Sequence, residues 1–77
     1  MFKKGQSYAS RICGTVVVRT IISECERYNE DDGKSHRYVE CNAVQILSNG
    51  ETYTEKYTIN AESFVADIVS GNWTIIK

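Results

Sequence analysis

The hydrophobic pattern of this 77-residue chain predicts three long β-strands in succession. Residues 14–28 and 35–48 are rich in β-branched and aromatic side chains and lack helical spacing, which is typical of strands. In residues 51–59, large apolar side chains alternate with threonine and lysine, a period of two that indicates a half-buried strand. Asn49-Gly50 predicts a tight hairpin between the last two strands, because both residue types tolerate a positive φ.

A helix is predicted after the third strand. Asn60 is a good N-cap, Ile59 and Phe64 occupy the positions of a hydrophobic staple, and Gly71 is placed to end the helix. The spacing of the apolar residues between these signals forms a single stripe along the helix. The stripe consists of Ala61, Phe64, Val65, Ile68 and Val69.

Residues 73–77 indicate a short final strand, with Trp73 as a core anchor. The N-terminal stretch "GQSYASRIC" indicates either an edge strand or an irregular arm. The predicted order is (β)-β-β-β-α-β, an α+β fold in which a small antiparallel meander of four or five strands carries one helix on one face. We expect residues 1–77 to form a single domain. A small, strongly bent barrel with the helix plugging one end is the alternative.

The cysteine usage and the absence of targeting signals predict free thiols in a cytoplasmic protein. The three cysteines are an odd number, and neither a signal peptide nor a membrane span is evident. Folding the chain about Gly33 places Cys25 opposite Cys41, so a cross-strand disulfide is geometrically possible, but a reducing compartment opposes it. Without a C-x-x-C or H-x₃-H pair, we expect no metal site.

The residues that enzymes use are poorly represented. His36 is the only histidine, it lies beside a charged turn, and no nucleophile elbow or phosphate-binding glycine loop occurs. Glu24 and Glu26 form a carboxylate pair, but Arg27 and Arg37 are their expected neighbours. A chain of this size leaves little room for a pocket of ~300 Å³ or more. We therefore expect no catalytic residues and no cofactor.

The two longest predicted strands are apolar on both faces. One helix of about three turns is ~16 Å long and covers only one face of a meander. The second face must be covered by the N-terminal arm, by barrel closure, by another copy of the chain or by a foreign partner, since uncovered apolar surface marks an interaction site. We expect a protein partner there, with the acidic hairpin tip as a steering rim. The predicted protein-binding residues are Glu30, Asp31, Asp32, Tyr38, Val44 and Ile46.

Two other functions remain open. Residues 1–19 contain basic side chains and no acid, so this half could bind nucleic acid although the formal net charge is −1. The residues of that alternative are Lys3, Lys4, Tyr8, Arg11 and Arg19. The third possibility is a homodimer that pairs through the second sheet face.

The opening "FKKGQSYASRIC…VVVRT", with its G-x-x-Y-x-x-R motif, resembles short orphan accessory proteins of phages and mobile elements. The resemblance covers about the first quarter of the chain. It implies a compact inhibitor or accessory factor that docks on a host protein and blocks it.

Overall fold

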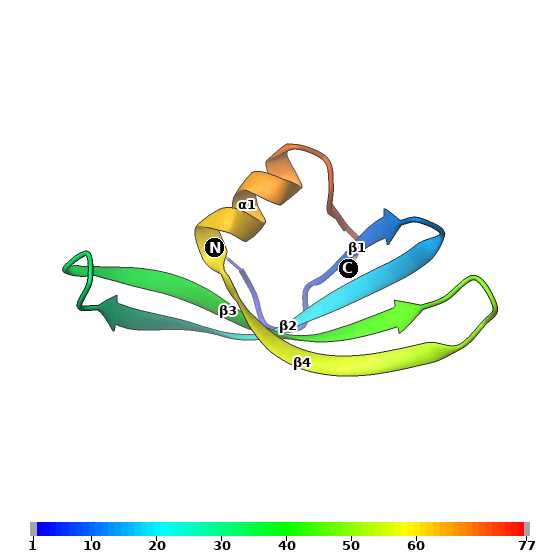
Figure 1. The fold of residues 1–77 in the computed structure, drawn as a ribbon, viewed down its shortest axis with the longest axis horizontal. Coiled ribbons are helices and arrows are strands. Elements are labelled where there is room, and N and C mark those ends of the chain that lie inside the picture. The colour runs from blue at the N-terminus through cyan, green and yellow to red at the C-terminus, as the bar shows by residue number, and fades with distance from the viewer. Residues whose placement is uncertain (1, 77) are drawn as a thin grey trace.

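The computed structural model describes residues 2–76, which form one antiparallel sheet and one helix (Figure 1). The elements are β1 (Ser7–Ile12), β2 (Thr15–Asn29), β3 (Lys34–Ile46), β4 (Thr52–Asn60), α1 (Ala61–Val69) and β5 (Thr74–Ile75). The five strands lie in the order β4-β3-β2-β1-β5, so β4 and β5 are at opposite edges. The α+β prediction is confirmed, and the sheet over these residues is open rather than closed into a barrel.

The N-terminal stretch is a strand inside the sheet, with β2 on one side of β1 and β5 on the other. Ile12 pairs directly with Thr15, so Cys13 and Gly14 alone make the turn between β1 and β2. Both have positive φ, 50° and 81°, as a two-residue hairpin turn of type I′ requires. The sequence did not predict this turn, because cysteine is an unusual residue at its first position.

The long hairpin of β2 and β3 has a different register from the one expected. Its turn is centred before Gly33, and a bulge at Ile22 shifts the pairing again. Cys25 therefore lies opposite Tyr38, and Cys41 lies opposite Ile21. Directly opposed residues share a face of the sheet, and Tyr38 and Cys41 are three residues apart on β3, so the register set by the turn places the two cysteines on opposite faces. The expected pairing of Cys25 with Cys41 is wrong, and the cross-strand geometry that would have made a disulfide between them possible is not present.

The Asn49-Gly50 hairpin is present, although only Gly50 has a positive φ, of 89°. The Gly50 N–H donates to the Leu47 carbonyl at 3.0 Å, and the Glu51 N–H donates to Asn49 Oδ1 at 3.0 Å. The loop is therefore longer than the two residues expected, and β3 ends at Ile46. Asn49 contributes its side chain to the turn instead of a left-handed backbone.

Helix α1 begins and ends as predicted. Asn60 Oδ1 accepts a hydrogen bond from the Ser63 N–H at 3.1 Å. At the other end, the Gly71 N–H donates to the Ile68 carbonyl and the Asn72 N–H to the Asp67 carbonyl, which is a Schellman motif.

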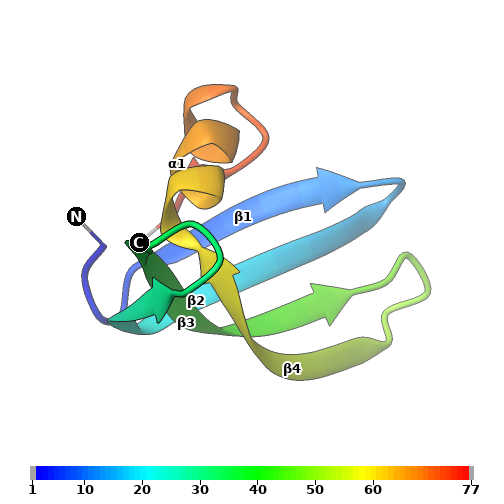
Figure 2. The ribbon, with the colours of Figure 1, turned by 60° about the vertical axis from the view of Figure 1, so that its left-hand side comes forward.

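The predicted apolar stripe is correct except at its last residue. Ala61 and Phe64 are buried, whereas Val69, the last residue of the helix, is 81% exposed. Figure 2 shows α1 standing on one face of the sheet.

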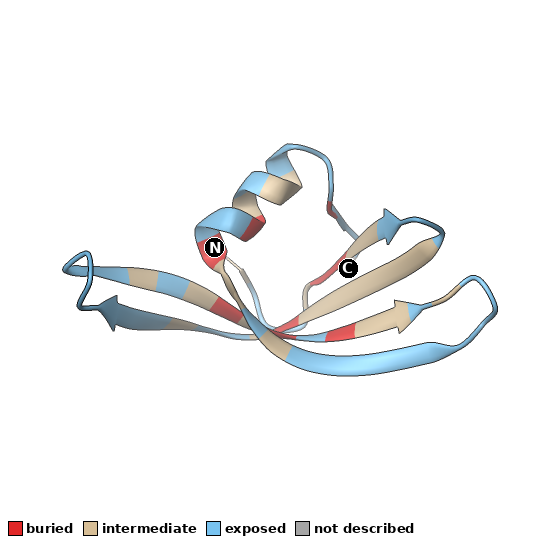
Figure 3. Cartoon of the chain, in the orientation of Figure 1, coloured by how far each residue is buried: buried red, intermediate tan, exposed pale blue. Residues whose placement is uncertain are grey.

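The core is an aromatic cluster between α1 and the middle of the sheet. Phe64 is 1% exposed and contacts Phe2, Tyr8 and Trp73, with ring centroids 5.2–5.7 Å apart. The prediction of Trp73 as a core anchor is confirmed. Phe2 lies on the helix side, so the N-terminal arm does not cover the second face of the sheet. Figure 3 shows the buried residues gathered beneath the helix.

The sheet is much longer than the helix that it carries. The molecule measures 45 × 23 × 23 Å, and α1 has nine residues, or ~14 Å of helix. In Figure 1 the β2–β3 hairpin extends past the helix on one side, and the other two hairpin turns extend past it on the opposite side. Within residues 2–76, α1 is the only helix, and it is too short and too polar to cross a membrane.

Candidate functional site: the open face of the sheet

The face of the sheet turned away from α1, called here the open face, has apolar side chains at its centre. Val18 lies between Ala9 on β1 and Val44 on β3, and Val16 lies opposite Ile46. Because directly opposed residues share a face, these side chains form one cluster across three strands. This apolar patch consists of Ala9, Val16, Val18, Val44 and Ile46.

No segment of residues 2–76 packs over the apolar patch. On the helix side of β3, Val39, Cys41 and Ala43 are at most 1% exposed. On the open face of the same strand, Val44 is half-buried and Ile46 is 39% exposed. Neighbouring strand residues alone produce this partial burial, since side chains on a sheet shield one another from water. The expected second apolar face is therefore present and uncovered.

Strand register also sorts the charged residues between the two faces. Besides His36, the open face carries the charged side chains Arg11, Arg27, Lys34, Lys56 and Glu40. Its one acid is already paired, because Lys56 Nζ lies 2.9 Å from Glu40 Oε1. The helix side carries Glu24, Glu26, Glu55, Glu62 and Asp67 against Arg19 and Arg37. The formal net charge of −1 is thus unevenly distributed, with a basic open face and an acidic helix side.

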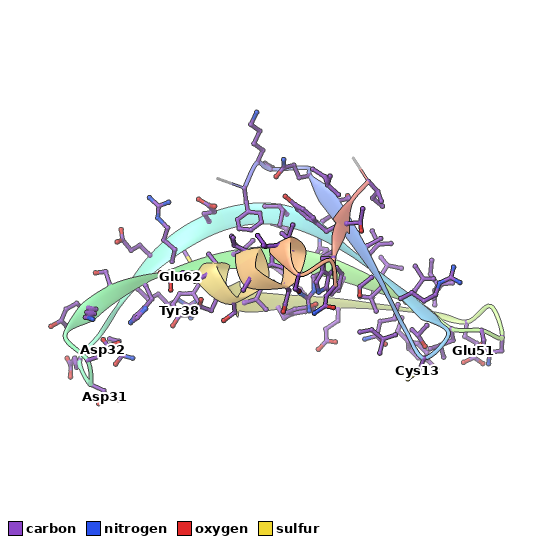
Figure 4. The ribbon with its side chains drawn as sticks, turned by 90° about the horizontal axis from the view of Figure 1, so that it is seen from above. Cys13, Asp31, Asp32, Tyr38, Glu51 and Glu62 are labelled. Atoms are coloured by element: carbon purple, nitrogen blue, oxygen red, sulfur yellow. The ribbon has the colours of Figure 1, made fainter. Side chains whose placement is uncertain are left out.

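Three of the predicted protein-binding residues lie together on the open face. Tyr38, Val44 and Ile46 lie on the same face of β3, an even number of residues apart. The guanidinium carbon of Arg27 lies over the ring of Tyr38, 5.4 Å from its centroid. The acidic residues of the tip are far from the apolar patch, because Val44 lies ten positions along β3 from Lys34, or roughly 33 Å. Figure 4 shows Asp31 and Asp32 at one end of the molecule and Cys13 and Glu51 at the other.

The tip residues form the turn itself. Asn29 Oδ1 accepts from the Asp31 N–H at 2.9 Å, and Asp32 Oδ1 accepts from the Lys34 N–H at 3.0 Å. Asp32 Oδ2 lies 2.6 Å from His36 Nε2. The hydrogen bond with His36 and that from the Lys34 amide lower the pKa of Asp32. Turn formation thus accounts for the carboxylate of Asp32.

The residues of the nucleic-acid alternative do not lie on one surface. Tyr8 is 7% exposed and packs on Phe64 in the core. Arg19 lies beneath the helix, where its Nε donates to the Tyr57 hydroxyl. Lys3, Lys4 and Arg11 remain exposed. The basic surface that sequence reasoning missed is the open face. The bulge at Ile22 contributes to this, since it places Arg27 on the same face as Val16 and Val18, which lie before the bulge on β2.

The cysteines are free and occupy three environments. Cys13 is exposed, Cys25 is half-buried and Cys41 is buried. Burial raises the pKa of the Cys41 thiol. Within the described chain, no three histidine, cysteine or acidic side chains converge closely enough to hold a metal ion.

Two open hollows lie on the helix side, which corrects the expectation that the chain is too small for one. A hollow of about 450 Å³ is bounded by the β2–β3 hairpin and the first half of α1, with Glu24, Glu26, Arg37 and Glu62 in its wall. A second, of about 720 Å³, lies between β1 and the segment that follows α1.

Compared with models of known protein families, with curated proteins and with solved structures, the chain matches none.

Proposed function

We propose that this protein is a non-enzymatic binding module that docks on another protein through the open face. The observation that carries the proposal is the apolar patch, which no segment of residues 2–76 covers. Burying this patch would remove β-branched side chains from water. The complex would gain about 25 cal/mol of binding free energy for each Å² of apolar area buried. An accessory protein of the phage type, acting in the cytoplasm and covering a functional surface of a host protein, fits this mode of action.

The chemistry of the open face favours a protein over nucleic acid. Its centre is aliphatic, whereas surfaces that bind single strands present aromatic rings on which bases stack. Tyr38 is the one aromatic residue near the middle of this face among the paired positions of β3, and Arg27 covers its ring.

The charges of the open face favour a partner with an acidic margin around an apolar centre. Arg11 and Lys56 flank the apolar patch from β1 and β4. Two copies meeting face to face would bring like charges together, which opposes a homodimer through this surface.

The test is a double substitution that changes the patch and spares the fold. Val16→Thr with Val44→Thr retains β-branching and strand propensity but adds two hydroxyl groups to the docking surface. After capture from a host lysate and identification of the partner by mass spectrometry, affinity is measured with both purified proteins at a salt concentration of ~150 mM, where exposed charges are screened beyond ~8 Å. We expect the double variant to bind at least tenfold more weakly and to melt within a few degrees of wild type.

A matched control changes charge far from the patch. Glu30→Gln with Asp31→Asn leaves the Asp32–His36 contact intact and should leave the affinity within about twofold at this salt concentration. Wild-type affinity of the double threonine variant would overturn docking through the patch.

Two further measurements separate the alternatives. The first is a gel shift with single- or double-stranded nucleic acid at ~150 mM salt. A shift that is lost in the double variant Arg11→Gln with Lys56→Gln would show that the partner is nucleic acid and not a protein. The second is the mass measured by light scattering. A doubled mass that returns to that of the monomer in the double threonine variant would show that the partner is a second copy of the chain.

A further inference from the structure

The larger hollow on the helix side contains a cation with an unusual environment. It lies between the edge of β1 and the segment connecting α1 to β5, and it includes Ser10 and Arg19, whose side chains face the helix side of the sheet. This hollow, the Arg19 pocket, is lined in part by Ser10, Arg11, Arg19, Asp67, Asn72 and Trp73.

Arg19 is held in place by three aromatic rings. Its guanidinium carbon lies 4.0 Å from the centroid of the Trp73 ring, 5.0 Å from that of Tyr57 and 5.2 Å from that of Phe64. Its Nε donates to the Tyr57 hydroxyl. Because cation–π contacts and this hydrogen bond fix the planar group, its remaining donors point in set directions.

Those remaining donors have no partner in residues 2–76. A guanidinium carries five N–H groups, and the contact with Tyr57 uses one of them. No carboxylate among these residues lies within ion-pair distance of Arg19, in contrast to Lys56 with Glu40. The last carbonyls of α1 accept from the backbone of Ser70, Gly71 and Asn72 instead. No buried side-chain nitrogen in the described chain lacks a partner, so the terminal N–H groups of Arg19 reach the solvent of the pocket.

We propose that the Arg19 pocket binds an oxyanion, the head group of a carboxylate or a phosphate. Two parallel N–H groups of a guanidinium match two oxygens of such a group, and the fixed fork reduces the entropy lost on binding. Ser10, whose side chain faces the helix side, and Asn72 supply neutral donors, whereas Arg11 lines the pocket only from the edge of β1, because register places its side chain on the open face. Asp67 is the opposing charge there, so its removal must strengthen binding if the ligand is an anion.

Trp73 provides the measurement, because it is the only tryptophan and forms a wall of the pocket. The intact protein is titrated with inorganic phosphate and, separately, with acetate, at constant ionic strength maintained by chloride. We expect saturable fluorescence changes in the millimolar range for at least one of them. Saturation by phosphate alone indicates a tetrahedral ligand, and saturation by acetate alone indicates a carboxylate.

Three variants test the assignment. Arg19→Gln should weaken binding at least tenfold, and Asp67→Asn should tighten it several-fold. The matched control is Arg37→Gln, which removes an exposed guanidinium from the same side of the sheet outside the pocket and should leave binding unchanged. Non-saturable titrations, or equal affinities of the Arg19 and Arg37 variants, would overturn the proposal.

A second measurement uses the wild-type chain, in case Arg19→Gln fails to fold. Backbone amide shifts on adding phosphate or acetate should be confined to Ser10, Arg11 and residues 71–74. Shifts centred on Lys3 and Lys4 instead would show general attraction of anions to exposed lysines and would refute the pocket. The pocket is tested through Arg19 and Asp67 and the apolar patch through Val16 and Val44, so failure of either proposal leaves the other standing.

Discussion

Cys13 occupies a left-handed backbone conformation, with φ at 50°, at the first position of the β1–β2 turn. For residues other than glycine, asparagine and aspartate this conformation is unfavourable by roughly 1–2 kcal/mol. Cys13→Asn should therefore raise the free energy of unfolding by about 0.5–1 kcal/mol, because asparagine suits this turn position. Urea denaturation measures the change. Gly14→Ala, at φ 81°, should lower stability, and a Cys13→Asn variant less stable than wild type would refute the turn geometry.

The same residue should be the first thiol to react. Cys13 is exposed and Cys41 is buried with a raised thiol pKa, so less thiolate is present and less is accessible at Cys41. With a chromogenic disulfide reagent at mildly alkaline pH, we expect fast reaction of Cys13, slower reaction of half-buried Cys25 and no reaction of Cys41 before unfolding. All three cysteines should be counted as free thiols in denaturant without reductant. A single free thiol would contradict this and the register that separates Cys25 from Cys41.

At the scale of the element, α1 contributes to stability through packing more than through helix propensity. Its nine residues are too few for an isolated helix in water, and Phe64 is its one large side chain at 1% exposure. Phe64→Ala should lower the free energy of unfolding by about 3–5 kcal/mol, a large part of what a small domain possesses.

Val69 provides the control for this prediction, since it lies on the same helix and is 81% exposed. Val69→Ala should change stability by less than about 0.5 kcal/mol. Both changes are measured by chemical denaturation followed by circular dichroism. Equal effects of the two substitutions would mean that the helix does not pack on the sheet through Phe64.

At the scale of the whole molecule, the uneven coverage of the sheet predicts uneven local stability. Residues 39–43 of β3 lie under the helix with three side chains at most 1% exposed, whereas the β2–β3 hairpin from residue 26 to residue 37 has no buried side chain. Amide hydrogens of the covered segment should exchange only through global unfolding, and those of the projecting hairpin through local opening. Hydrogen exchange followed by NMR tests this. Uniform protection along β3 would contradict the prediction.

Local chemistry in the sequence was sufficient to predict most elements. The Asn60 cap, the Phe64 staple position and Gly71 define the helix, because each acts within one or two turns of it. Apolar positions on both faces of β3 were likewise readable from alternation, and they indicated Tyr38, Val44 and Ile46 correctly as one face.

Tertiary structure alone decided the register of β2 and β3 and the contacts that depend on it. A bulge reverses every later side chain of a strand, and neither the bulge at Ile22 nor the Cys13 turn has a distinctive sequence signature. The basic character of the open face, the separation of Cys25 from Cys41 and the position of Arg19 among three rings therefore could not be derived from spacing. Alternation along a strand is a local property, whereas the face on which a residue finally lies is set by pairing with strands distant in the sequence.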